Sequence, residues 1–228
     1  MKKIVFDTGP IISLTMNNLL WLLEPLKRIS NANFYITDLV KKELVDTPLN
    51  KTKRYKFEAL QVLHYIENGT LEVIDADEEK TNELLSIANN CFKAFDHNMN
   101  LLHDAELSAV SLYLQIKANA FVVDEKTTRL LIENPNKLHN ILKHTLHTKI
   151  EENKANIKEF REITKSVKMI RSVELVTIAY EKGLLDKYLT HISEARKTLL
   201  ESVLWGVKLN GCAVSKREIE QIIKMEVR

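Results

Sequence analysis

Lys3-Ile4-Val5-Phe6-Asp7, close to the start of the chain, is a short apolar run that ends at an aspartate. A second run of the same kind, Ala120-Phe121-Val122-Val123-Asp124, occurs much later in the chain. Because both runs are apolar throughout and partly β-branched, they are predicted to be buried strands of a parallel sheet. Ligands bind outside the carboxyl ends of the strands in such sheets, so both aspartates are expected at the functional edge.

Strands and helices are predicted to alternate along most of the chain. A further strand ends at Thr37 and another covers residues 71–74, while helices are predicted at about 11–28, 55–67 and 78–94. Alternation of this kind indicates βαβ units and a parallel sheet. Glycine and proline number only 5 and 4, which argues for a helix-rich fold without long coil linkers.

Two further acidic residues are expected to reach the same edge from helices. Glu43 follows the strand that ends at Thr37 and falls near the first turns of the next predicted helix. Asp104 opens the segment 104–112, where an aspartate favours the positive end of a helix dipole. Carboxylates that are distant in sequence are therefore predicted to share one crevice, namely Asp7, Glu43, Asp104 and Asp124.

Several carboxylates in one crevice repel one another. Two charges about 4 Å apart repel by roughly 4 kcal/mol at an effective dielectric constant of about 20, a large share of a domain stability of about 5–15 kcal/mol. Either some carboxyl groups are protonated or a divalent cation neutralises them. Oxygen ligands suit Mg²⁺ or Mn²⁺, which can activate water for phosphodiester hydrolysis. A single aspartate after a strand is more often a turn former or N-cap, so the prediction of metal-dependent nucleic-acid hydrolysis rests on the whole set.

The acidic motifs, in this order, resemble those of the PIN-domain nucleases. The segments that carry the resemblance are 4–12, 36–45, 103–109 and 122–125. Residues 167–175 and 179–185 look like the last strand and helix of the prokaryotic, VapC-like PIN branch, and residues 211–215 are similar to a stretch in its helical tail.

This resemblance implies a three-layer α/β/α sandwich with a central parallel sheet. It also implies an endoribonuclease that uses Mg²⁺ or Mn²⁺, with Asp7, Glu43, Asp104 and Asp124 as catalytic metal ligands. Many members of the family are toxins of toxin–antitoxin pairs, and others process ribosomal RNA. RNA and a protein antitoxin are thus the partners that the resemblance suggests, and a homodimer is consistent with it.

Two positions depart from the family pattern. Gly9 stands where relatives often carry serine or asparagine, and Val122-Val123 precede Asp124 where many carry threonine or serine. Such side chains orient metal-binding carboxylates, and their loss weakens metal affinity by about 10–100-fold. The alternative function is therefore a catalytically weak or inactive PIN-like protein that binds RNA or serves in assembly. A phosphohydrolase with Asp7 as nucleophile is disfavoured, because Gly9 replaces the second aspartate that this chemistry usually needs.

The chain is expected to form one PIN-like domain over residues 1–190 and a helical extension, packed on that domain, over residues 191–228. Residues 134–164 are polar and helix-prone, and they are predicted to form a protruding hairpin of two helices, about 137–148 and 151–164. Three interpretations of this insertion stay open: a solvated surface, a clamp on the RNA backbone, or a dimer contact through its apolar stripe. Lys42 and Arg129 are candidate phosphate contacts that serve equally well as surface charges.

Composition sets the remaining limits. A hydrophobic content of 45% with 28% charged residues is typical of a soluble globular protein. The net charge of +2 is too small to indicate nucleic-acid binding by itself, so an RNA-binding surface would have to be local. Cys91 and Cys212 form neither a metal-ligand spacing nor a disulfide framework, which is consistent with a reducing cytoplasm. Apolar runs are too short to cross a membrane, so a cytoplasmic protein is expected.

Overall fold

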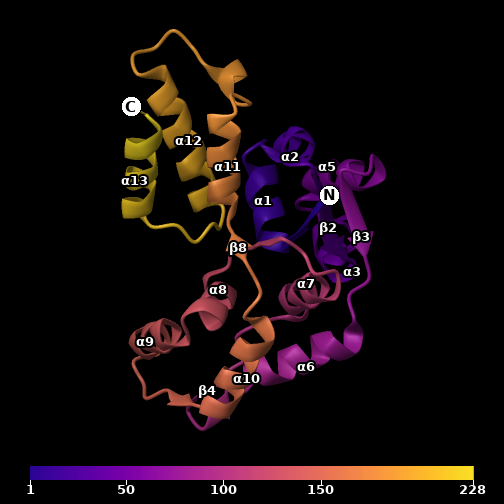
Figure 1. The fold of residues 1–228 in the computed structure, drawn as a ribbon, viewed down its shortest axis with the longest axis vertical. Coiled ribbons are helices and arrows are strands. Elements are labelled where there is room, and N and C mark those ends of the chain that lie inside the picture. The colour runs from indigo at the N-terminus through magenta and orange to yellow at the C-terminus, as the bar shows by residue number, and fades with distance from the viewer. Residues whose placement is uncertain (228) are drawn as a thin grey trace.

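The computed structural model describes residues 1–227, and a five-stranded parallel sheet lies at their centre (Figure 1). The strand order is β3-β2-β1-β6-β8, and each neighbouring pair is parallel. This confirms the predicted parallel sheet. The strands are β1 (Lys2–Phe6), β2 (Ala32–Thr37), β3 (Leu71–Ile74), β6 (Ala120–Val122) and β8 (Met169–Ile170).

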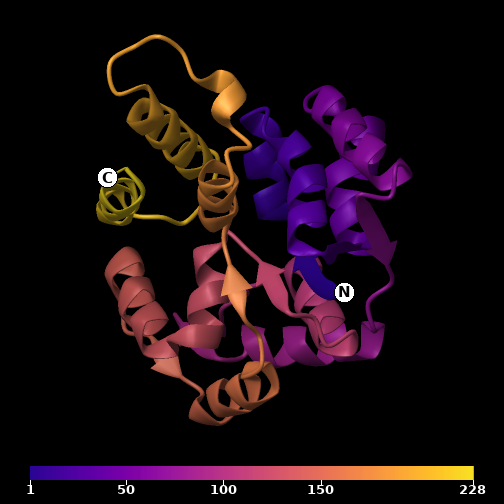
Figure 2. The ribbon, with the colours of Figure 1, turned by 45° about the horizontal axis from the view of Figure 1, so that its top comes forward.

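The apolar runs are strands because both of their faces are covered. Phe6, Phe34 and Phe121 are fully or almost fully buried, and the rings of Phe6 and Phe34 pack with their centroids 5.1 Å apart. Figure 2 shows helices above and below the sheet, which confirms the three-layer α/β/α arrangement. The helices of the first half are α1 (Thr8–Met16), α2 (Leu23–Ser30), α3 (Asp38–Lys41), α4 (Thr47–Lys51), α5 (Lys56–Glu67), α6 (Glu78–Asn89) and α7 (Asp104–Gln115).

The two helical layers differ in origin. On one side α7 packs along β1, β2 and β6, with α6 behind it, while α2 and α5 pack on β2 and β3 from the other side (Figure 2). Short irregular helices join these elements, namely η1 (Leu20–Leu22), the π-helical turn η2 (Lys42–Asp46) and η3 (Asp186–Tyr188). The helices of the second half are α8 (Lys126–Glu133), α9 (Pro135–Leu146), α10 (Lys154–Thr164), α11 (Ser172–Glu181), α12 (Ala195–Leu209) and α13 (Lys216–Glu226).

The prediction of one continuous helix over residues 11–28 is wrong, because the chain forms separate helices there. The chain leaves α1 at Asn17, and Asn18 adopts the left-handed conformation with φ +54° before η1 and α2 follow. Asparagine tolerates this conformation better than most residues. The amide of Leu19 donates back to the carbonyl of Leu14 at 2.8 Å, which closes the end of α1.

The helix predicted to run to residue 94 ends at Asn89. Beyond it, β4 (Phe92–Ala94) and β5 (His97–Asn98) form an antiparallel hairpin. Phe95 and Asp96 make the turn with φ values of +52° and +64°, the left-handed pair that suits the twist of a two-residue hairpin. The ring of Phe92 is fully buried, and this burial anchors the hairpin.

The insertion contains two helices, as predicted, but it does not protrude. β7 (Glu151–Glu152) pairs with β4 in a small antiparallel sheet, and α10 packs on α6 and α8. Phe160 of α10 is fully buried and Leu138 of α9 is nearly so. The apolar face of each helix thus lies against the domain, because leaving that area in water would cost free energy.

The C-terminal helices pack on the start of the domain. α12 contacts both α11 and α1, and α13 packs on α12 (Figure 1). A Cβ atom at Gly206 would come within 2.4 Å of the Asn17 side chain, so glycine permits this close approach of α12 to α1. Arg171 donates to the carbonyl oxygen of Ala213 at 2.9 Å and to Glu218 at 3.0 Å, which fastens the final loop and helix to α11.

Across residues 1–227, every helix is too short or too polar to traverse a lipid bilayer.

Candidate active site

Asp7 lies at the carboxyl end of the central strand β1 and begins α1. Its amide donates to the carbonyl of Val122 at 2.9 Å, which brings the ends of β1 and β6 together. The residue is only 3% exposed, and its Oδ1 atom finds no hydrogen-bond partner among residues 1–227. Burial, followed by the negative charges of Glu106 and Glu43, raises the pKa of Asp7 from 3.8 to about 7. A buried carboxyl group surrounded by other carboxylates is costly to ionise unless a cation is present.

Glu43 reaches the same edge from β2. The hydroxyl of Thr37 at the end of β2 accepts a hydrogen bond from the amide of Val40 and so caps α3. The chain then passes into η2, where Glu43 accepts a hydrogen bond from the Thr8 hydroxyl at 2.7 Å. Thr8 is the residue after Asp7, so this bond links the ends of β1 and β2. Single π-helical turns such as η2 occur often at functional sites.

The third carboxylate whose charge is coupled to Asp7 and Glu43 is Glu106, not Asp104. Glu106 accepts a hydrogen bond from the His103 amide at 2.9 Å at the start of α7. Burial, with the charges of Glu125 and Glu43 adding to it, raises the pKa of Glu106 from 4.5 to about 7. Asp104 is exposed, and within the described part of the chain its carboxylate makes no hydrogen bond or ion pair. Helix positions two residues apart point in nearly opposite directions, so the two side chains cannot face the same way.

Asp124 joins three elements instead of standing free at the edge. It is 2% exposed, and its carboxylate accepts from the amide and the hydroxyl of Ser172, both at 2.7 Å, and from the hydroxyl of Ser13 at 2.8 Å. Ser13 lies on α1 and Ser172 begins α11, so Asp124 ties β6 to both helices. The next residue, Glu125, caps α8 by accepting from the Thr128 amide at 2.8 Å, and its charge acts on Glu106.

We expect Asp124→Ala to lower the free energy of unfolding by about 2–4 kcal/mol, because it leaves the buried amide and hydroxyl of Ser172 without their acceptor and removes one of the two acceptors of the Ser13 hydroxyl. Urea unfolding at pH 7 in EDTA measures this effect, with Asp104→Ala as an exposed control expected to change stability by under about 0.5 kcal/mol. If Asp124 served only as one of several repelling carboxylates, its removal would instead stabilise the metal-free protein.

The structure thus brings together Asp7 and Glu43 from the predicted set and adds two residues that sequence reasoning missed. Asp7, Glu43, Glu106 and Glu125 are coupled through their charges, and we call them the acidic cluster. The missed residues carry weak signals: Glu106 is the third residue of its helix and Glu125 is an N-cap. Each follows closely after a predicted ligand, Asp104 or Asp124, so the predicted motifs and the acidic cluster share these two segments.

The donor set of the acidic cluster fits a hard divalent cation. All of its side chains offer carboxylate oxygens, two have a pKa raised to about 7, and Asp7 Oδ1 lacks a partner. As arranged in residues 1–227, no three histidine, cysteine, aspartate or glutamate side chains converge closely enough to hold one ion. Joint ligation by the cluster would therefore need rotation of its side chains.

The candidate phosphate contacts differ in their surroundings. Arg129 is paired with Glu133 at 3.7 Å, one turn further along α8. Lys42, beside Glu43, is exposed and has no ion pair in the part of the chain that the structure describes.

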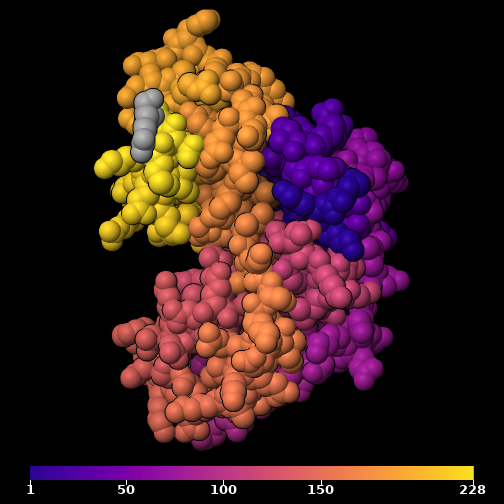
Figure 3. All heavy atoms as spheres, in the orientation of Figure 1, coloured from indigo at the N-terminus to yellow at the C-terminus, as the bar shows by residue number. Residues whose placement is uncertain are grey.

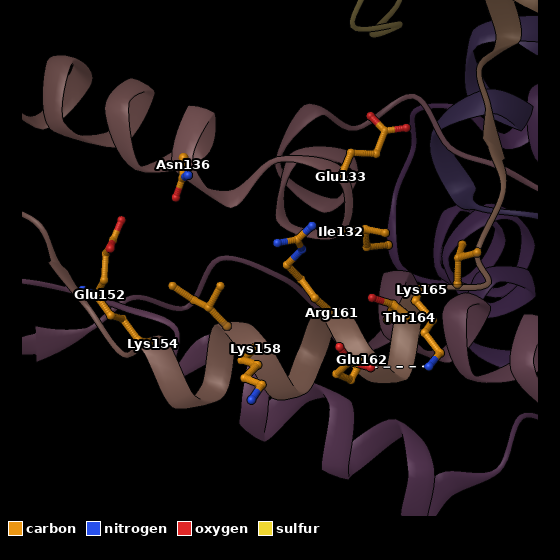
Figure 4. A pocket seen from close by; sticks show the side chains of 12 residues that line it. Ile132, Glu133, Asn136, Glu152, Lys154, Lys158, Arg161, Glu162, Thr164 and Lys165 are labelled. Carbon is orange, nitrogen blue, oxygen red and sulfur yellow. Dashed lines mark hydrogen bonds and ion pairs between the residues drawn. The ribbon is translucent and has the colours of Figure 1, made fainter.

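A groove lined by both basic and acidic side chains lies farther along α8. It is a cavity of about 560 Å³ between α8–α9 and α10. Figure 4 shows Arg161 extending from α10 toward Ile132 of α8, and Glu162 paired with Lys165 at 3.4 Å. Lys154, Lys158 and Arg161 have no ion pair within residues 1–227. Figure 3 shows the surface hollowed between α8–α9 and the C-terminal helices, so solvent reaches this side of α8–α9.

The family model that matches this chain is DUF3368, described as a PIN domain, and it covers residues 3–136. No curated protein and no solved structure gave a significant match. The matched range includes β1, β2, β3 and β6 and all members of the acidic cluster. PIN domains are typically nucleases, hydrolases that generally use divalent metal ions. Because the match spans more than half of the chain and the fold agrees with it, this chain belongs to the PIN-domain family.

Proposed function

We propose that this protein is a metal-dependent endoribonuclease that hydrolyses RNA phosphodiester bonds at the acidic cluster. The observation that carries the proposal is the state of Asp7. Its carboxyl group is buried, one oxygen has no partner within residues 1–227, and like charges help to raise its pKa to about 7. Burying a group in this way lowers stability, and a bound cation would reverse the effect by satisfying the oxygen and the charges together.

Asp7, Glu43 and Glu106 are the residues that would hold Mg²⁺ or Mn²⁺, with Glu125 beside them. When bound, the metal supplies an activated water and neutralises the charge that develops on the phosphate. The protein orients the carboxylates: the Thr8 hydroxyl holds Glu43 at 2.7 Å, and the His103 amide holds Glu106 at 2.9 Å. Because the pKa values of Asp7 and Glu106 lie near 7, cation binding at neutral pH would release protons from them.

Hydroxyl partners of Asp124 come from residues other than the two that precede it. Val122 and Val123 lack hydroxyls, but Ser13 and Ser172 donate to Asp124. Asp124 in turn lies against Gly9. A Cβ atom added at Gly9 would be 3.5 Å from the Cβ atom of Asp124 and 3.8 Å from Oδ2 of Asp7. The Asp124 carboxylate is thus oriented by hydroxyl groups even though the family hydroxyl before it is missing.

The three cations of the groove along α8 that lack an ion pair within residues 1–227 support RNA as the substrate. α8 connects the groove to the acidic cluster, because this helix follows Glu125 directly and ends at Glu133 in the groove wall. Lys154, Lys158 and Arg161 follow one another at helical spacing along α10. Cations of this kind contact phosphates regardless of sequence and make binding depend on salt. We propose that they bind the RNA backbone at a distance from the site of cleavage.

Cleavage of a mixed-sequence RNA by the purified protein tests the function. We expect internal cuts with Mn²⁺ or Mg²⁺, because the bound metal supplies the activated water and neutralises the developing charge. Cleavage should be lost completely in EDTA and should recover when the metal is restored. Activity that is indifferent to EDTA would contradict the proposal.

RNA binding without cleavage at millimolar Mn²⁺ would favour the alternative, a PIN-like protein that binds RNA or serves in assembly. A toxin role held in check by an antitoxin is a narrower proposal, which co-expression with a neighbouring reading frame would test.

A further inference from the structure

A second cavity adjoins the acidic cluster and has a different chemistry from it. Its volume is about 360 Å³, and it lies between α1, the η2–α4 segment and α5. Glu43 belongs both to its wall and to the cluster. The rest of the wall is mainly apolar, formed by Ile12, Met16, Leu44, Pro48, Tyr55 and Val62. We call this cavity the apolar pocket.

Helical spacing makes the apolar pocket continuous with the acidic cluster. Thr8, which holds Glu43, is followed by Ile12 and Met16 at intervals of four residues along α1. Residues with this spacing lie on one face of a helix, so the same face passes from the cluster into the pocket. Asn210, which follows α12, contributes to the wall as well and brings the C-terminal extension to the site.

The pocket exposes side chains that a domain of this size would normally bury. Ile12 is 43% exposed, Met16 40% and Tyr55 55%. Tyr55 also has a left-handed backbone with φ +64°, which is costly for an aromatic residue, and it makes no side-chain hydrogen bond that caps α5. Apolar exposure and backbone strain together at the rim of a concave site indicate ligand binding more than folding.

Of the four polar side chains in the wall, Thr15, Glu43 and Asn210 already have hydrogen-bond partners, and Glu58 does not within the described residues. Glu58 of α5 is half-buried in the wall, and its carboxylate has no hydrogen bond or ion pair in the described residues. An ionised carboxylate only accepts hydrogen bonds, so it selects a ligand with N–H donors. A ligand for this pocket is therefore flat and largely apolar, with donors on one edge. Among RNA components, guanine alone offers two adjacent donors on one edge, and an aromatic ring such as Tyr55 is a stacking surface for any base.

We infer that the apolar pocket receives a nucleobase of the RNA strand beside the scissile phosphate, and that Glu58 makes it prefer guanine. The inference rests on the proposed function, because it takes RNA as the substrate. Continuity through Glu43 and the donor–acceptor match at Glu58 favour a base over an apolar protein segment. Tyr55 and Met16 would contact the faces of the base.

Binding of guanosine 5′-monophosphate in EDTA tests the inference without any cleavage. In protein labelled at isoleucine and methionine methyl groups, the nucleotide should shift the Ile12 and Met16 signals and leave Met225, which is exposed on α13, unchanged. Adenosine monophosphate carries the same phosphate but lacks the paired donors, so it should bind about tenfold more weakly.

Glu58→Gln should reduce the affinity for the guanine nucleotide by about tenfold, because an uncharged amide replaces the ionised acceptor. Glu67→Gln is the matched control, since Glu67 is an exposed glutamate on the same helix and lies outside the pocket. Equal affinities of the Glu58→Gln variant and the wild type would overturn the inference, and so would methyl shifts confined to other parts of the protein.

The outcomes separate this inference from the proposed function. Guanine binding that depends on Glu58, in a protein that cuts no RNA, would support the pocket and contradict the nuclease. RNA cleavage without any guanine binding would support the nuclease and overturn the pocket. A wild-type dimer that Met16→Glu converts to monomers in sedimentation, with no nucleotide binding, would assign this face to a second copy of the chain and also overturn the inference.

Discussion

Asp7→Asn is expected to reduce metal-dependent cleavage by about 10³-fold or more and to stabilise the metal-free protein at pH 8. The loss of activity follows because Asp7 is the most buried oxygen donor of the acidic cluster and an amide carries no charge to hold the cation. The gain in stability follows because the substitution removes a buried carboxylate that its neighbours repel.

The sign of the pH dependence is fixed by the direction of the pKa shift. The pKa of Asp7 is about 7 in the folded protein and 3.8 ordinarily, so between these values the folded state binds more protons than the unfolded state. The free energy of unfolding therefore falls as pH rises from about 4 to about 7, by on the order of 4 kcal/mol from this group. Glu106 acts in the same direction. Glu218, whose pKa is lowered to about 2, titrates below this window.

Urea unfolding in EDTA at pH 5 and pH 8, together with cleavage assays in Mn²⁺, measures both effects. Wild-type stability should be lower at pH 8, and Asp7→Asn should remove much of the difference. Asp96→Asn is a suitable control, because Asp96 is exposed in a hairpin turn whose left-handed backbone asparagine also accepts. An active Asp7→Asn variant, or a wild type that becomes more stable toward pH 8, would show that Asp7 does not have the proposed role.

Glu106→Gln should lower both Mn²⁺ affinity and cleavage by about 100-fold or more, whereas Asp104→Asn should change them only a few-fold. Glutamine keeps a carbonyl oxygen for the His103 amide, so the start of α7 is retained while the charge is lost. Asp104 is exposed and lies on another side of the helix. Calorimetric titration with Mn²⁺ separates metal binding from chemistry.

The comparison of these two variants decides which acid of α7 serves the site. The motif resemblance points to Asp104, and the structure points to Glu106. If Asp104→Asn lost metal binding while Glu106→Gln kept it, the acidic cluster as defined by charge coupling would be the wrong set, although the edge of the sheet would still be the site.

Local sequence signals predicted elements well where burial dictates them and poorly where single residues end them. The apolar runs before Asp7 and Asp124 were predicted correctly as strands, because a central strand of the sheet buries its side chains on both faces. The left-handed turn at Asn18 was missed because a helical pattern continues across it, and the hairpin at Phe95–Asp96 was missed because the predicted helix ran over its first strand to residue 94.

Residue patterns alone were enough to predict the alternation of strands and helices, the parallel sheet and the acidic segments that follow its strands. Hydrophobic periodicity and strand ends are local properties, so they can be read without coordinates. Which carboxyl groups interact through their charges follows from the packing of the folded chain. The charge of Glu106 acts on Asp7, and the serines of α1 and α11 donate hydrogen bonds to Asp124. These outcomes depend on contacts between residues that are distant in sequence, and no local pattern encodes them.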